Sequence, residues 1–159
     1  MVDAPVAVSM TAVTARVAPS ALANARRTVV GWDAGRLAMI LAVLEARCGI
    51  PFTGLDVYLN VAGGMRISEP AADLAVAAAL LSAREDVALP ADMAVFGEIS
   101  LSGALRPVGQ AENRLKEARK LGFNAAIVPA GGKLTGDGGL SLTQMKDLAT
   151  FVGDVFGAG

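Results

Sequence analysis

Histidine is absent from this 159-residue sequence, and cysteine occurs only once, at Cys48. Without histidine the chain cannot build a Ser-His-Asp or a Cys-His catalytic site. Cysteine and histidine are also the usual ligands of structural Zn²⁺, so a metal site is not expected. A single cysteine cannot form an intramolecular disulfide bond, which suits a reducing compartment, and a cytoplasmic location is therefore predicted.

Aromatic residues and net charge are also scarce. One Trp and one Tyr do not provide the stacking surface that single-strand-binding proteins use. A net charge of −1 argues against a chain that is basic overall. The charge is uneven, however, because residues 101–120 hold five basic residues against Glu112 and Glu117. A basic face confined to this region is compatible with binding to DNA phosphates.

Long uncharged apolar runs are missing as well, although 53% of the residues are hydrophobic. No segment approaches the ~20 apolar residues that a membrane-spanning helix requires, so no membrane partner is expected. Arg16, Arg26 and Arg27 interrupt the N-terminal region, which does not resemble a signal peptide. The length and apolar content predict one globular domain.

The stretch that organises the chain runs from Asp56 to Leu81. Alternating apolar residues over 56–62 predict a buried strand, and Gly63-Gly64 ends it. Ser68 is suited to cap the following helix, and Pro70 suits its first turn. That helix is almost entirely Ala, Leu and Val, so it should be buried on all sides. Asp73 is the exception, and its carboxylate must find a partner or an interface.

The remaining patterns predict a mixture of strands and helices. Strands are expected at 7–17, 29–31 and 125–129, helices at 33–48, 68–84 and 109–121, a hairpin of 93–101 with 104–108 around Ser102-Gly103, a Gly-rich loop at 130–139, and a final helix from Thr143. This order predicts an α+β (mixed α/β) fold in a single domain over residues 7–157, preceded by a disordered extension at 1–6.

The Gly-rich loop does not predict a nucleotide site. Lys133 follows Gly131-Gly132, but Leu134 stands where a phosphate-binding loop needs a hydroxyl group. No cofactor is therefore expected for this domain.

Two segments resemble the Lon-type protease domain. Residues 97–103, Gly-Glu-Ile-Ser-Leu-Ser-Gly, and Pro107-Val108-Gly109 are similar to that family's Gly-Glu-Ile-Thr-Leu-x-Gly and Pro-Ile-Gly-Gly stretch. The resemblance implies a Lon protease-like fold, also called ribosomal protein S5 domain 2-like, and a Ser-Lys dyad. Ala71 occupies the serine position and Glu112 the lysine position. Neither side chain can perform the chemistry of the residue it replaces, so the domain is predicted not to be an enzyme.

One alternative keeps a peptidase function. Ser68 precedes Ala71 by three residues, and Lys116 follows Glu112 by one helical turn, roughly 6 Å along the axis. A relocated Ser68–Lys116 dyad would make the chain a Lon-like peptidase. The plainer interpretation is that Ser68 caps a helix and Lys116 is a solvated surface charge.

Longer segments are similar to the C-terminal Lon-like domain of the RadA (Sms) family of bacterial DNA-repair ATPases. They include VVGWDAGRLAMILAVLEARCG, DVYLNVAGG, EPAADLAVAAAL, FGEISLSGALRPVGQ and RLKEARKLGF, and the resemblance spans residues 8–155. It implies a non-catalytic module that forms a homo-hexameric ring and contacts single-stranded or branched DNA during recombinational repair and branch migration. It also implies contact with the recombinase RecA through the full-length protein.

ATP, Mg²⁺ and Zn²⁺ are expected only with the ATPase and zinc modules of such a full-length protein, which these residues do not contain. Arginine is the residue best matched to phosphate geometry. The candidates for DNA contact are Arg26, Arg27, Arg66, Arg106, Arg114 and Arg119.

Overall fold

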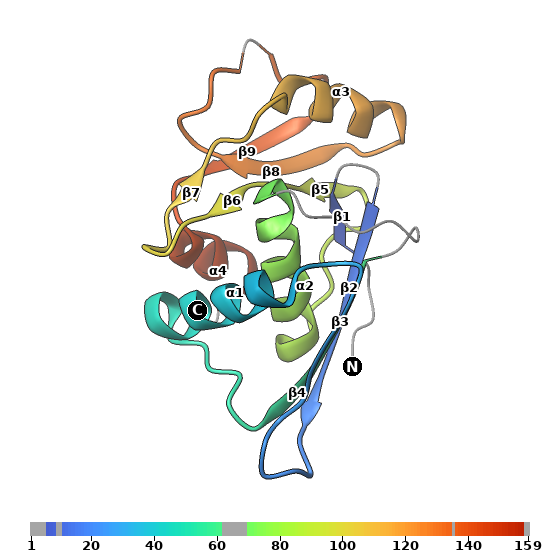
Figure 1. The fold of residues 1–159 in the computed structure, drawn as a ribbon. Coiled ribbons are helices and arrows are strands. Elements are labelled where there is room, and N and C mark those ends of the chain that lie inside the picture. Colours follow the sequence, from blue (N-terminus) through green and yellow to red (C-terminus); the bar gives the residue numbers. More distant parts are fainter. Residues whose placement is uncertain (1–5, 9–10, 62–69, 135, 158–159) are drawn as a thin grey trace.

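The computed structural model describes residues 6–8, 11–61, 70–134 and 136–157 (Figure 1). The predicted Gly63-Gly64 break, the Ser68 cap and the Arg66 candidate lie outside the described residues. So does the predicted N-terminal extension up to residue 5, whereas Val6 already belongs to the first strand.

A seven-stranded mixed sheet forms the framework, in the order β3-β4-β2-β1-β5-β8-β9. Its strands are β1 (Val6–Val8), β2 (Thr11–Pro19), β3 (Arg27–Val30), β4 (Leu55–Val61), β5 (Met93–Val95), β8 (Ala125–Pro129) and β9 (Ser141–Met145). The β1–β2 and β2–β4 pairs are antiparallel, and the other neighbours are parallel. Two short strands, β6 (Glu98–Ile99) and β7 (Leu105–Arg106), form a separate antiparallel hairpin. The predicted α+β class is confirmed.

The helices are α1 (Ala34–Cys48), the short 3-10 turn η1 (Pro70–Ala72), α2 (Asp73–Glu85), α3 (Ala111–Lys120) and α4 (Leu148–Phe156). Helix α2 lies at the centre and contacts β1, β2, α1 and α4 (Figure 1). All of its residues from Asp73 to Ala83 are buried, as its uniformly apolar sequence predicts. Its many alanines allow neighbouring elements to approach the helix axis closely.

Strand β4 confirms the predicted alternation. Val57, Leu59 and Val61 are buried, whereas Tyr58 and Asn60 point to the exposed face. One face of this strand therefore packs into the core, and the other faces solvent.

The predicted helix from Thr143 is wrong. Residues 141–145 form strand β9, which pairs in parallel with β8, and the helix starts only at Leu148. Met145 is buried as a strand residue, so its apolar side chain does not mark a helix face. The open edge of β8 supplies hydrogen bonds that local sequence periodicity does not reveal.

Three strand predictions also need adjustment. The strand expected at 7–17 is two strands, β1 and β2, and the one expected at 29–31 is β3 at 27–30. The expected hairpin is shorter than predicted, since only β6 and β7 pair across the turn and β5 belongs to the large sheet.

Asp147 caps helix α4. Its carboxylate accepts a hydrogen bond of 2.7 Å from the backbone N–H of Thr150, which would otherwise be unsatisfied at the helix start. Hydrogen bonds from the hydroxyl and the N–H of Thr150 hold the pKa of Asp147 below its ordinary value. The cap therefore stabilises the fold only while the carboxylate is ionised.

We predict that Asp147→Ala lowers the free energy of unfolding by about 1 kcal/mol at neutral pH, because the cap is lost. Because the pKa of Asp147 is lower in the folded state than in the unfolded state, its carboxylate stabilises the fold fully at pH values above the unfolded-state pKa. This stabilisation is lost as the pH falls through the folded-state pKa. The difference from the wild type should therefore shrink on acidification, as measured by urea unfolding. Asp154→Ala, an exposed change within the same helix, is the control. A difference that does not depend on pH would contradict the assignment.

Candidate functional site

The best-defined polar feature of the described structure is the ion pair between half-buried Arg36 and fully buried Asp73. Asp73 is 0% exposed and is the first residue of α2. Its Oδ1 accepts a hydrogen bond of 2.8 Å from Arg36 Nε, and its Oδ2 accepts one from Arg36 Nη2. The backbone N–H of Ile99 donates to Oδ2 at 3.0 Å. The expectation that Asp73 has a partner is confirmed.

Arg36 is held in place from α1. Asp33 caps that helix and accepts the backbone N–H of Arg36 at 2.9 Å, so the arginine projects from a fixed first turn. The bidentate fork matches the geometry of a carboxylate. Sequence reasoning did not identify Arg36 as the partner, because the two residues are 37 positions apart and only the packing of α1 against α2 joins them.

Burial raises the pKa of Asp73 above its ordinary value, while the hydrogen bonds from Arg36 and Ile99 act in the opposite direction. The hydrogen bond to Asp73 raises the pKa of Arg36. An unpaired carboxylate at this depth would be strongly unfavourable. Without the guanidinium, Asp73 would keep only the Ile99 N–H as a hydrogen-bond partner.

The segment before β6 clamps the same helix start. The N–H of Gly97 donates to Ala71 O at 2.9 Å, and the N–H of Leu74 donates to Gly97 O at 3.0 Å. A Cβ on Gly97 would lie 2.9 Å from Cγ of Pro129, so a side chain does not fit there. Glycine is thus required where this segment passes between α2 and the end of β8.

The two positions that the Lon-type resemblance singles out lie in different elements. Ala71 is buried in η1, and Glu112 is half-buried in the first turn of α3. Lys116 of the alternative dyad is exposed one turn further along α3, and Ser68 lies outside the described residues. The absence of a catalytic dyad stays a prediction, based on the chemistry of a methyl group and a carboxylate.

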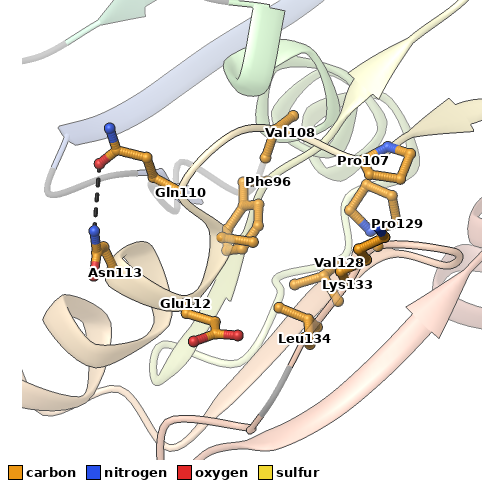
Figure 2. A pocket seen from close by; sticks show the side chains of 12 residues that line it. Phe96, Pro107, Val108, Gln110, Glu112, Asn113, Val128, Pro129, Lys133 and Leu134 are labelled. Carbon is orange, nitrogen blue, oxygen red and sulfur yellow. Dashed lines mark hydrogen bonds between the residues drawn. The ribbon is translucent and has the colours of Figure 1, made fainter.

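Glu112 lines a cavity of about 410 Å³ between α3, the end of β8 and the 107–110 segment (Figure 2). The walls are mainly apolar and include Phe96, Val108, Val128 and Leu134. The described residues that line it include no Ser, Thr or Cys, so none supplies a nucleophilic oxygen or sulfur. The lining also includes the polar residues Gln110, Glu112, Asn113 and Lys133, so the cavity offers polar as well as apolar contacts.

The arginine candidates differ in what they contact. The side chain of Arg27 donates to the carbonyl oxygens of Leu55 and Phe52, the latter at 3.0 Å. Arg114 Nε donates to Gly109 O at 3.1 Å, and Arg119 Nη1 donates to Asn124 Oδ1 at 2.9 Å. These three side chains thus take part in the fold itself.

The other candidates are Arg26, Arg106 and Arg66. Arg26 uses its backbone N–H to bind Asp56 Oδ1 at 2.6 Å, and this bond lowers the pKa of Asp56. Arg106 is exposed on β7, and Arg66 lies outside the described residues. Arg26 and Arg106 are therefore both exposed candidates whose guanidinium groups face solvent.

Metal and membrane chemistry find no support in the described part of the chain. It contains no group of three His, Cys, Asp or Glu side chains that could hold a metal ion. Within the same residues, no helix combines the length and apolar character needed to cross a bilayer.

The fold and the site together define a single α+β domain with a buried ion pair and an apolar cavity. The family described as subunit ChlI of Mg-chelatase matches residues 35–132, which is more than half of the sequence. The chain belongs to this family.

Particular relatives are DNA repair proteins named RadA. The chain is 60% identical over 146 residues to RadA of Brucella abortus (strain 2308), covering 91% of this chain and 31% of that protein. RadA of Rickettsia bellii (strain RML369-C) is 50% identical over 141 residues. RadA of Synechocystis sp. is 52% identical over 117 residues, 23% of its length. The expected resemblance to RadA is confirmed, and the chain spans about a third or less of these relatives.

We predict that removing Arg36 and removing Asp73 lower the free energy of unfolding by different amounts. Arg36→Met leaves Asp73 buried with only the Ile99 N–H, so it should lower the unfolding free energy by about 3–5 kcal/mol. Asp73→Leu should cost less, because the Arg36 side chain is 26% exposed and can reach water. Chemical denaturation measures both.

The control is Glu85→Gln in the partly exposed Arg84–Glu85 pair, which should cost about 1 kcal/mol or less. The double variant Arg36→Met/Asp73→Leu should recover part of the loss from Arg36→Met, because no buried charge remains. Equal losses from both single variants would contradict this account.

Proposed function

We propose that this chain is a non-catalytic domain of a DNA-repair ATPase, which forms a ring and contacts DNA. The main support is the 60% identity to a DNA repair protein RadA over 91% of the chain. The RadA names denote DNA repair in those proteins, and the proposal extends that role to this chain. Ala71 and Glu112 at the dyad positions favour a scaffold over a peptidase.

The proposed assembly is a homo-hexameric ring in the cytoplasm, in which single-stranded or branched DNA is bound through phosphate contacts. ATP hydrolysis, Mg²⁺ and Zn²⁺ would belong to other modules of the full-length protein, and contact with the recombinase RecA would require that protein. The near-neutral charge of the chain implies that one copy binds DNA weakly and that several copies together bind it more tightly.

The alternative is a Lon-like peptidase that uses Ser68 and Lys116. The exposure of Lys116 disfavours it, because a lysine that acts as a general base needs a desolvated setting that lowers its pKa. Incubation of concentrated protein with unfolded peptide substrates distinguishes the two functions. Cleavage that is abolished by both Ser68→Ala and Lys116→Ala would favour the peptidase.

DNA binding is the first prediction from the proposed function. The wild-type chain should bind a labelled single-stranded oligonucleotide without sequence preference in fluorescence anisotropy. The slope of log K against log salt should be about −0.7 for each phosphate neutralised. An affinity that does not change with salt, or no binding at low salt, would contradict DNA contact through phosphates.

Self-association is the second prediction. Heterologous contacts that close a ring should give a hexamer at high protein concentration, because a ring uses the same two surfaces on every copy. Light scattering after size-exclusion chromatography measures the mass. A monomer at all accessible concentrations would contradict the ring-forming role of this domain, whatever the result of the DNA experiment.

A further inference from the structure

The β6–β7 hairpin ends in an exposed apolar side chain. Leu101 is 72% exposed, more than any other large hydrophobic residue that the structure describes. It belongs to the turn that joins Ile99 to Leu105, at the projecting end of the hairpin (Figure 1). Single exposed apolar residues are common on proteins, so the surroundings of Leu101 decide whether this one is significant.

Hydrogen bonds make the turn rigid. The N–H of Ser100 donates to Ala104 O, and the N–H of Gly103 donates to Ser100 O, both at 2.9 Å. The hydroxyl groups of Ser100 and Ser102 lie 2.8 Å apart, and the N–H of Ala104 donates to Ser100 Oγ at 3.1 Å. Leu101 is thus presented in one backbone conformation, which reduces the entropy lost when it binds.

The turn of the hairpin is held against two helices through Gly103. The N–H of Leu148, at the start of α4, donates to Gly103 O at 2.8 Å. A Cβ on Gly103, whose φ is +88°, would lie 3.3 Å from Cβ of Arg47 near the end of α1. The N–H of Leu105 donates to Lys146 O at 2.9 Å. The turn is therefore held in a fixed position on the domain.

These contacts also place cations beside the turn. Arg47 lies against Gly103, Lys146 lies beside Leu105, and Arg106 is the next residue of β7; all three are exposed. Two acids are near. Asp147 is bound to the N–H of Thr150, and Glu98 pairs in register with Arg106 but is half-buried. Three exposed cations thus lie near the turn, whereas the two acids are half-buried.

We propose that this hairpin is a wedge for branched DNA, in which Leu101 enters between bases at the junction while Arg47, Arg106 and Lys146 bind the flanking phosphates. Apolar side chains that unstack bases beside phosphate-binding cations are a known mode of DNA contact. Insertion is easiest where bases are already unpaired, so a fork should be preferred over continuous duplex. This inference rests on the proposed DNA-contact function and assigns it to one surface.

A tryptophan at the tip reports insertion directly. Trp32, the only native tryptophan, is 3% exposed and gives a constant background. In the full chain, Leu101→Trp should lose emission on addition of a forked DNA, because the indole stacks on bases. A blunt duplex of the same sequence should quench it less. Leu121→Trp, at a site that is 50% exposed just after α3, should respond to neither DNA.

Further variants separate the contributions of the apolar side chain and of the cations to DNA binding. Leu101→Ser should weaken binding of the fork by about fivefold or more and leave duplex affinity unchanged. Each of Arg47→Ala, Arg106→Ala and Lys146→Ala should reduce the magnitude of the log–log salt slope by about 0.7–0.9. Lys116→Ala and Lys120→Ala, on exposed positions of α3, should not change it. Circular dichroism confirms that each variant is folded.

The outcomes distinguish this inference from the function on which it rests. If the wild type binds DNA but Trp at 101 and Trp at 121 respond alike, the wedge is overturned and DNA contact stands. If the wild type binds no DNA at low salt, both fail. Emission of Trp at 101 that responds to anionic phospholipid vesicles and not to forked DNA overturns the wedge in favour of a membrane surface.

Discussion

The ion pair between Arg36 and Asp73 is the constraint on which the centre of this domain depends. It joins the first turn of α1 to the first turn of α2, and its carboxylate also receives the N–H of Ile99. Three segments far apart in sequence are thereby fixed around one buried charge. Since an unpaired carboxylate at this depth is unfavourable, the three segments stabilise one another through Asp73.

This arrangement also bears on the site suggested by the Lon-type resemblance. The helix start that would carry a nucleophile carries Ala71, and the polar function nearby belongs to Asp73, which is engaged by Arg36. Glu112 lies in another element, at the wall of an apolar cavity. Asp73 thus holds three backbone segments together through its hydrogen bonds to Arg36 and Ile99.

The chain belongs to the ChlI family and is similar to RadA, but it covers only 31% of its Brucella relative. What this part contributes must therefore come from its own surfaces. Arginine type alone did not identify such a surface, because Arg27, Arg114 and Arg119 bind groups within the fold. Arg47 and Lys146 are far apart in sequence, and contacts of α1 and of the β9–α4 connection bring both residues to the β6–β7 hairpin.

The sequence by itself determined the elements with strong local signals: the uniformly apolar α2, the alternating β4, the capped α1 and the α+β class. It also determined that Asp73 needed a partner, because the cost of burying a charge does not depend on the fold. Only the tertiary structure decided that the partner is Arg36, that residues 141–145 are a strand, and that Arg47 and Lys146 lie close to the turn before Arg106. Long-range pairing and packing set these features, and neither periodicity nor residue type carries that information.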